Sequence, residues 1–179
     1  MPVQQVKNVL DTYGISYECI KHATVYTAQE IAAATHIPGR ELAKTVMIKA
    51  GGKMIMAVLP ASQRVDFGLL KEVLGARMVE LAREQEFKDM FPGCTVGAMP
   101  PFGNLYGVDV YVEETLTTDE RITFNAGSHT EVMRIAYKDF ARLVNPKVAK
   151  FARPIAAGNR PACGSMPREN STWPEIKPT

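Results

Sequence analysis

The sequence predicts a single α/β domain of the α+β type, in which helices flank a mixed, partly antiparallel β-sheet. Segments typical of strands outnumber the helices that could separate them one by one, and several are joined by tight turns. The clearest turn, Gly51-Gly52, connects the β-type runs 44–50 and 53–60, as expected for an antiparallel hairpin. A doubly wound parallel sheet would instead need a crossover between successive strands.

The length and composition are those of one globular domain. The chain has 179 residues, of which 46% are hydrophobic and 22% are charged, so it can bury a substantial core. No apolar run approaches the roughly 18 residues that cross a bilayer, and the stretch 1–5 lacks the basic and apolar regions of a signal peptide. We therefore expect a cytoplasmic protein without a membrane partner.

The N-terminal part is expected to alternate helix and strand. Apolar residues recur on one face of 2–13, which predicts a first helix, and the alternating run 15–20 predicts a strand. Thr27 and Glu30 match a capping box, so a second helix should begin there.

The elements after the hairpin follow the same signals. Asp66 is placed to cap a helix over 67–74. A short strand over 77–81 and a short helix over 84–91 should follow it. The remaining expected elements are strands at 108–112, 121–125 and 131–136 and a closing helix at 137–144.

The charge distribution divides the chain into a body, 1–151, and a basic, proline-rich tail, 152–179, which we expect to be poorly ordered. Residues 1–144 hold 15 Lys and Arg against 17 Asp and Glu, whereas residues 145–179 hold 6 against 2. Such a body is not a broad surface for neutralising phosphates, so we expect no DNA partner. A nucleic acid would be contacted over a small part only.

Familiar catalytic and metal-binding patterns are missing from the sequence. Cys94 could in principle pair with His129, but it has no surrounding motif, and a lone cysteine is more often a small buried apolar residue. The other cysteines, Cys19 and Cys163, complete an odd count without a CxxC pair, and His22, His36 and His129 lack metal-ligand spacing. We expect no metal and no cofactor.

The stretch Gly97–Gly103 is the most unusual local sequence. Two glycines enclose Pro100 and Pro101, which predicts a stiff loop with an exposed backbone. Composition alone favours an ordinary turn over a binding site. Taken singly, Lys44 at a strand start is more typical of a solvated lysine, and His129 of a turn residue that satisfies the backbone.

Three motifs in order change this interpretation: Glu41–Val46, the Gly97-xxx-Pro101 loop and Ala126–His129. Together they resemble the YbaK/prolyl-tRNA editing family over about residues 1–146. The resemblance implies a single domain with a barrel-like mixed sheet. It also implies a hydrolase that acts in trans on a mischarged tRNA, such as tRNA-Pro carrying a small amino acid, and cleaves its ester.

The resemblance also implies residue roles. Lys44 corresponds to the most important functional side chain and engages the tRNA 3′ end, the loop positions the aminoacyl group through its backbone, and His129 shapes the pocket. The expected substrate-binding set is Gly97, Ala98, Met99, Pro100, Pro101, Phe102, Gly103, Gly127, Ser128 and His129. The expected partner is the 3′ acceptor end of an aminoacyl-tRNA, with a synthetase as a further candidate.

Such an activity makes physical sense without a metal or a catalytic triad. A synthetase pocket rejects a smaller amino acid poorly, because a missing methylene is worth only about 1–3 kcal/mol, so a second site must remove errors. An activated ester needs a held water and donors aimed at the developing oxyanion. Family members process alanine, cysteine, serine or threonine, and the choice among these stays open, as does the oligomeric state.

Two alternatives also stay open. The same fold could serve as a non-catalytic module that binds a tRNA end, a nucleotide or a protein, since fold does not determine function. A thiol-dependent hydrolase that uses Cys94 is the other alternative.

Overall fold

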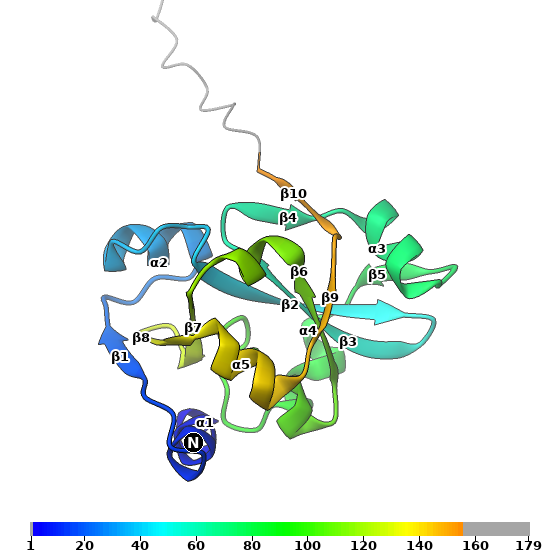
Figure 1. Cartoon of the computed structure of the whole chain (residues 1–179). Coiled ribbons are helices and arrows are strands. Elements are labelled where there is room, and N and C mark those ends of the chain that lie inside the picture. Colours follow the sequence, from blue (N-terminus) through cyan, green and yellow to red (C-terminus); the bar gives the residue numbers. More distant parts are fainter. Residues whose placement is uncertain (1, 156–179) are drawn as a thin grey trace, which may run out of the picture.

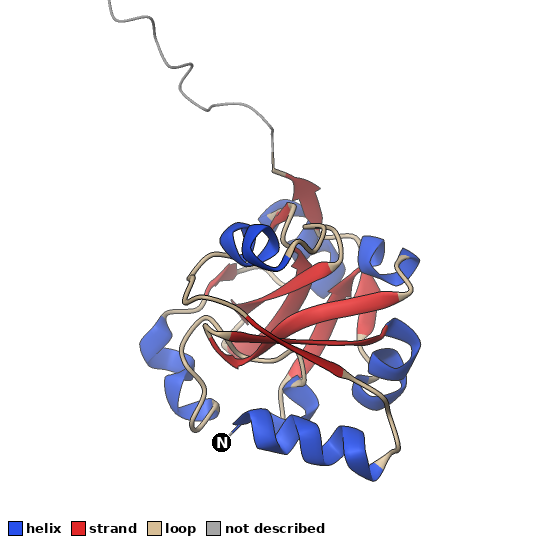
Figure 2. Cartoon of the chain, turned by 90° about the vertical axis from the view of Figure 1, so that its left-hand side faces the viewer, coloured by secondary structure: helices blue, strands red, loops and turns tan. Residues whose placement is uncertain are grey.

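A mixed β-sheet surrounded by helices forms the body of the protein in a computed structural model that describes residues 2–155 (Figures 1 and 2). The expected tail residues 156–179 lie outside the described part. The helices are α1 (Pro2–Thr12), α2 (Ala28–Thr35), α3 (Phe67–Leu74), α4 (Glu84–Phe87) and α5 (Tyr137–Val144), with 3₁₀ turns η1 (Lys88–Met90), η2 (Gly103–Tyr106) and η3 (Glu114–Thr118). The strands are β1 (Glu18–Lys21), β2 (Leu42–Ala50), β3 (Lys53–Pro60), β4 (Gln63–Val65), β5 (Val79–Leu81), β6 (Asp109–Glu113), β7 (Arg121–Ser128), β8 (Glu131–Ala136), β9 (Lys147–Ala149) and β10 (Ala152–Pro154).

The main sheet has the strand order β1-β8-β7-β2-β3-β6-β9, and β5 pairs additionally with β2. Strand pairs β1–β8, β7–β8, β2–β3 and β2–β5 are antiparallel, whereas β2–β7, β3–β6 and β6–β9 are parallel. The expected mixed, partly antiparallel sheet is therefore confirmed. Within residues 2–155 no pairing joins the end strands β1 and β9, so the barrel-like form is not confirmed.

The hairpin β2–β3 is the longest strand pair and has the expected turn. Gly51 and Gly52 have φ of 55° and 85°, which a two-residue hairpin turn requires and which glycine adopts without strain. The register runs from Ala50 opposite Lys53 to Ala43 opposite Pro60. Strand β2 begins at Leu42, two residues before the expected start.

Side chains alternate between the two faces of the sheet. On β2, Ala43 and Met47 belong to the largest core cluster, whereas Ile48 belongs to a second cluster on the opposite face. Because of this alternation, Lys44 lies on the face away from the largest cluster. A third cluster, under α2, covers part of that face.

The C-terminal strands extend the body beyond its expected end at residue 151. Strand β10 pairs with β4, and the N–H of Ile155 donates to the carbonyl of Ser62 at 3.0 Å. The buried carboxylate of Glu113 accepts hydrogen bonds from the N–H groups of Phe151 and Ala152 at 2.7 and 2.8 Å. Residues 152–155 therefore belong to the folded body as an edge strand and its end. The expected boundary at residue 151 is too early by these four residues.

Most local signals agree with the observed elements. Thr27 and Glu30 form the expected capping box, and Asp66 caps α3 through the N–H of Leu69. The expected strand 15–20 starts only at Glu18, and the expected helix 84–91 divides into α4 and η1. No helix of residues 2–155 has the length and apolar character needed to cross a membrane.

Candidate active site

The site is organised around a fork between the parallel strands β2 and β7. Their pairing is limited to Leu42 opposite Thr123 and Ala43 opposite Phe124. Beyond this point the loop at 95–98 pairs with β7 instead. The N–H of Thr95 donates to the Gly127 carbonyl at 3.0 Å, and the N–H of Gly127 donates to the Ala98 carbonyl at 2.9 Å.

The loop has a strained conformation that suits glycine. Gly97 has φ of 85°, in the region that side chains disfavour. The N–H of Ala98 donates back to the Thr95 carbonyl at 3.0 Å, and the N–H of Gly97 meets the Met99 sulfur at 3.2 Å. No hydrogen bond of residues 2–155 uses the N–H of Met99. The N–H of Met99 is thus unpaired inside the fold, and the N–H of the exposed Gly97 is bound only weakly, to a sulfur.

A β-bulge turns the end of β7 toward this loop. The register between β7 and β8 shifts between Asn125 and Ser128, and Gly127 within the bulge has φ of 97°. Bulges re-aim the side chains that follow them. Here the following residue is His129.

His129 is fastened to the loop and to the segment before α2. Its Nε2 lies 3.2 Å from the Val96 carbonyl oxygen, and its ring centre lies 5.1 Å from that of Tyr26. The N–H of Val25 donates to the His129 carbonyl at 3.3 Å. Since a carbonyl can only accept, Nε2 carries a proton, and in the neutral imidazole Nδ1 is then the acceptor. This Nδ1 is buried and has no partner among the described residues.

Lys44 lies one residue beyond the last β2–β7 pair, at the fork itself. It occupies the same sheet face as Asn125, because Phe124 and Ala43 both point into the largest core cluster. The side chain is half-buried, and burial lowers the pKa of its ammonium group. None of the ion pairs within residues 2–155 involves Lys44.

Hydrogen bonds connect some of the predicted site residues directly, whereas Lys44 is only adjacent to them. Direct contacts join the loop, Gly127 and His129, whereas Lys44 is placed beside them by strand register alone. Ser128 lies within the bulged strand end, where its Oγ is 3.3 Å from Thr130 Oγ1.

The loop's own side chains point into the core. Met99, Pro100 and Pro101 are buried. Phe102 is fully buried, with its ring centre 5.4 Å from that of Phe124 and 5.8 Å from that of Phe140. A Cβ on Gly103 would lie 2.8 Å from the Val108 carbonyl oxygen. These residues therefore support the loop, in which Gly97 is the exposed position.

Two neighbours of the site carried no signal that singled them out in the sequence. The ring of Tyr26 packs at a tilt of 60° against that of His129, although 73% of the Tyr26 surface is exposed. Its place immediately before the capping box at Thr27 is the one clue, since such positions often carry a packing residue. Asn125 has a buried Oδ1 without a partner in residues 2–155, and only its position next to the Ala126–His129 motif points to it.

Cys94 is not arranged as a nucleophile. It is half-buried, and burial raises the pKa of its thiol, which opposes formation of a thiolate at neutral pH. The nearby imidazole is bound through Nε2 to the Val96 carbonyl. Neither feature favours the thiol-dependent alternative.

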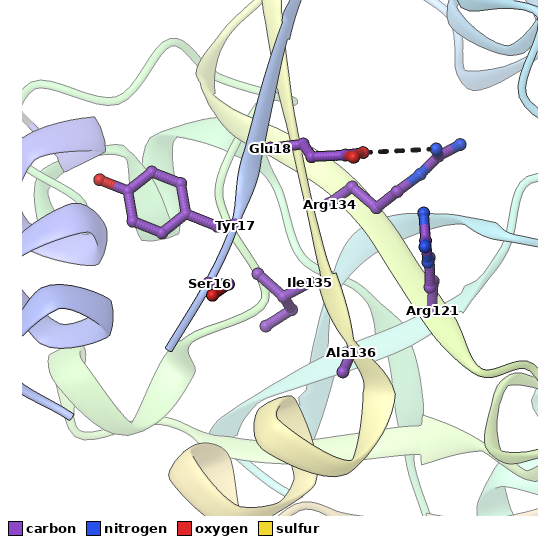
Figure 3. A pocket seen from close by; sticks show the side chains of 7 residues that line it. All are labelled: Ser16, Tyr17, Glu18, Arg121, Arg134, Ile135 and Ala136. Carbon is purple, nitrogen blue, oxygen red and sulfur yellow. Dashed lines mark hydrogen bonds and ion pairs between the residues drawn. The ribbon is translucent and has the colours of Figure 1, made fainter. Parts of the chain in front are cut away.

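A separate groove of about 250 Å³ lies where the chain before β1 diverges from β8 (Figure 3). Arg134 reaches toward Glu18 at 3.5 Å and also pairs with Glu41 at 3.1 Å, while Arg121 stands beside it. Tyr17 points the other way. The groove shares no residue with the predicted site. Its lining residues are Ser16, Tyr17, Glu18, Arg121, Arg134, Ile135 and Ala136.

Comparison with known proteins relates residues 22–143 to a family model described as an aminoacyl-tRNA editing domain. The multifunctional Ser/Thr-tRNA deacylase ProXp-y of Escherichia coli (strain K12) is 24% identical over 155 residues, which cover 84% of this chain and 92% of that protein. The proline–tRNA ligase of Thermosipho africanus (strain TCF52B) is 28% identical over 79 residues, which cover 44% of this chain and 14% of the ligase.

Solved structures share the fold. A candidate trans-editing enzyme for prolyl tRNA synthetase superposes with a TM-score of 0.74 at 20% identity, covering 85% of this chain and 97% of that one. The residues matched by the family model include Lys44, the Gly97 loop and His129. The motifs and the fork that they surround therefore lie in the part of the chain that matches the editing-domain model.

Proposed function

The chain belongs to the aminoacyl-tRNA editing domain family, and from this premise we propose that it is a deacylase that hydrolyses the ester of a mischarged aminoacyl-tRNA. The observation that carries the proposal is the junction of the Gly97 loop with Gly127 and His129, beside Lys44 at the β2–β7 fork. The site offers backbone donors, a fixed imidazole and one cation.

The loop supplies rigidity and N–H groups. Its buried side chains hold the backbone in place, and the exposed Gly97 presents an N–H whose partner in the fold is the Met99 sulfur at 3.2 Å, a weak acceptor that an ester carbonyl can replace. Donors arranged in advance stabilise the negative charge that develops on that oxygen in the transition state. Removing one such donor typically costs about 10²–10³ in rate.

Lys44 supplies the positive charge. Its half-buried ammonium group has no carboxylate partner in residues 2–155, so it can bind a phosphate or a hydroxyl of the terminal nucleotide. Charge-assisted hydrogen bonds of this kind are about twice as strong as neutral ones. Lys44 thereby orients the ester over the loop.

The reaction itself is a hydrolysis. Water adds to the ester carbonyl, the bond between that carbon and the ribose oxygen breaks, and the ribose oxygen takes up a proton. The products are the free amino acid and the tRNA with its terminal hydroxyl restored. The ester is activated, so positioning of water and substrate provides much of the acceleration, as intramolecular reactions show.

The substrate is a small amino acid on a tRNA such as tRNA-Pro, and the protein acts in trans. The relative named a Ser/Thr-tRNA deacylase and the partial match to a proline–tRNA ligase support this choice. A proline pocket excludes smaller amino acids by only about 1–3 kcal/mol, which leaves errors for a second site to remove.

The test is a deacylation panel with purified full-length protein. tRNA-Pro charged with alanine, serine, threonine, cysteine or proline is incubated with the wild type, with Lys44→Ala and with Lys21→Ala, which changes an exposed lysine outside the site. We expect wild type and Lys21→Ala to release at least one small amino acid and to spare proline. Lys44→Ala should fall close to the uncatalysed rate.

Two outcomes would contradict the proposal. If no charged tRNA is deacylated above the Lys44→Ala background, the protein is not an editing hydrolase for these substrates. If the same tRNAs bind without ester cleavage, the non-catalytic module is the better description.

A further inference from the structure

Tyr26 is the most exposed large apolar or aromatic side chain of residues 2–155, with 73% of its surface open to solvent. Single exposed side chains of this kind are common on protein surfaces and by themselves indicate nothing. The place of Tyr26 sets it apart, because its ring lies against that of His129 at the candidate site, with 5.1 Å between the ring centres.

The backbone around Tyr26 is held on both sides of the residue. The N–H of Val25 donates to the His129 carbonyl at 3.3 Å, and the N–H of Tyr26 donates to Glu30 Oε2 at 3.2 Å. Thr27 then caps α2. None of the hydrogen bonds within residues 2–155 uses the Tyr26 hydroxyl. The fold therefore determines where the ring lies and leaves the ring itself available for contact.

His129 lies between Tyr26 and the Gly97 loop. Its Nε2 is 3.2 Å from the Val96 carbonyl oxygen, and its Cε1 would lie 3.7 Å from a Cβ on Gly97. The tyrosine ring is thus one side chain away from the exposed Gly97, the position proposed above to meet the ester carbonyl. In an aminoacyl-tRNA the ester is joined to the ribose of the terminal adenosine, so the base follows the ester after one sugar.

The charge beside Tyr26 favours a neutral group on the ring. Glu30 accepts hydrogen bonds from the N–H of Thr27 at 3.0 Å and from that of Tyr26 at 3.2 Å, and these bonds lower the pKa of its carboxyl group. The carboxylate is therefore ionised at neutral pH and repels a phosphate, but it does not repel an uncharged base. Aromatic side chains stack on the faces of bases, because every base has a π-surface.

We infer that Tyr26 is the surface on which the terminal adenine of the tRNA stacks. This inference rests on the proposed deacylase function and adds a base-binding residue to it. Every tRNA ends in adenosine, so the contact strengthens binding of each aminoacyl-tRNA equally and contributes nothing to the choice among amino acids. The stack is the same before and during the reaction, so loss of the ring should raise KM and leave kcat nearly unchanged.

Two other roles for Tyr26 lead to different results. A ring that only supports His129 acts through the position of the Gly97 loop, so its loss should lower kcat. A ring that binds the α-ammonium group of the aminoacyl moiety through a cation–π contact acts whether or not a base is present. The base is therefore the part of the substrate to change.

The experiment uses the full-length protein and two forms of one aminoacylated tRNA, charged with the amino acid that the deacylation panel identifies. One form ends in the normal adenosine, and the other ends in a ribose without a base. Wild type, Tyr26→Ala and Tyr26→Phe are compared by steady-state kinetics. Tyr13→Ala is the matched control, because Tyr13 is 62% exposed and lies directly after α1, outside the site.

On the normal tRNA, Tyr26→Ala should raise KM about 5-fold to 150-fold, the range typical of one stacked base. Tyr26→Phe keeps a ring of the same size and should match the wild type, as should Tyr13→Ala. On the tRNA without the terminal base, wild type and Tyr26→Ala should have the same KM, because the partner of the ring is absent.

Several results would overturn the inference. Equal wild-type KM values for the two tRNAs would do so whether or not the variants fold. A Tyr26→Ala protein that loses as much on the base-free tRNA as on the normal one would indicate contact with the ammonium group, and a fall in kcat at unchanged KM would indicate support of His129. Either result leaves the deacylase function standing. If the wild type cleaves no charged tRNA, that function fails, and the inference fails with it.

Discussion

The imidazole of His129 is bound to the carbonyl of Val96, with Nε2 and the oxygen 3.2 Å apart. This contact joins the turn after β7 to the loop that fills the β2–β7 fork. It also determines the tautomer of His129, because the carbonyl requires a donor. A single hydrogen bond thus links the position of the loop to the chemistry of the candidate site.

Replacement of His129 by alanine should remove both effects. The loop would lose one of its attachments and the pocket would lose an acceptor, so we expect kcat/KM for deacylation to fall about 10-fold to 100-fold. Hydrogen exchange of the amides at 95–98 should accelerate in the same variant. Steady-state deacylation and exchange detected by mass spectrometry measure the two quantities.

The matched control is His36→Asn. His36 is exposed and caps the end of α2 with φ of 56°, a conformation that asparagine tolerates. Wild-type activity and exchange in this variant, together with losses in His129→Ala, fit the account. Unchanged exchange at 95–98 in His129→Ala would show that the histidine does not hold the loop.

Replacement of Gly97 by alanine should harm activity through the backbone. A Cβ would fit, since its nearest neighbour is His129 Cε1 at 3.7 Å, but φ of 85° is unfavourable for alanine by about 1–2 kcal/mol. The loop would relax and move its N–H groups, which should lower kcat about 10-fold to 100-fold. Gly14→Ala, at φ of 65° and with open space around it, should cost similar stability and leave kcat unchanged.

Replacement of Gly103 by alanine should act on the fold instead. The added Cβ would lie 2.8 Å from both the Val108 carbonyl oxygen and Val110 Cγ2, which is too close without movement of the backbone. We expect a loss of about 1–3 kcal/mol in the free energy of unfolding, as for other overpacked cores. Thermal unfolding measures the loss. A variant with wild-type stability and impaired catalysis would instead place Gly103 in direct contact with substrate.

Lys44 should reduce stability while it supports function. Burial lowers the pKa of its ammonium group, so the folded state binds this proton less tightly than the unfolded state does. The resulting penalty is fully present below the folded-state pKa and disappears as the pH rises toward the ordinary lysine value of about 10.4. Lys44→Met should therefore be more stable than the wild type at neutral pH, and the difference should shrink in alkaline buffer.

Urea unfolding of both proteins at several pH values measures this effect. In thermal unfolding, a gain of about 1 kcal/mol would appear as a rise in Tm of about 2–4 °C. Lys21→Met, at an exposed lysine, provides the control and should change stability little. A Lys44→Met protein less stable than the wild type at neutral pH would mean that the ammonium group has a favourable partner in the fold.

The sequence predicted the turns and helix ends that depend on residues close together in the chain. The hairpin turn at Gly51-Gly52 and the caps at Thr27 and Asp66 form through residues a few positions apart, and all were predicted. The strands β4, β9 and β10 were not, because each has three residues and exists through pairing with a distant strand. Short edge strands of this kind have no periodicity to detect.

The candidate site was predictable only in part. The motifs around Lys44, Gly97 and His129 suggested a shared site through their resemblance to a family, while single residues favoured ordinary roles. The bulge that turns β7 toward the loop depends on pairing between β7 and β8, so the contact of His129 with Val96 could not be deduced from spacing. Asn125 became visible only through its unsatisfied oxygen.

The most direct measurement of the central claim is a crystal structure with a non-hydrolysable substrate analogue, seryl-adenosine joined by an amide in place of the ester. The account predicts the aminoacyl group over the Gly97 loop, with its polar atoms within hydrogen-bond distance of Lys44 Nζ and His129 Nδ1. An analogue bound in the groove beside Arg121 and Arg134, with the fork between β2 and β7 unoccupied, would contradict it.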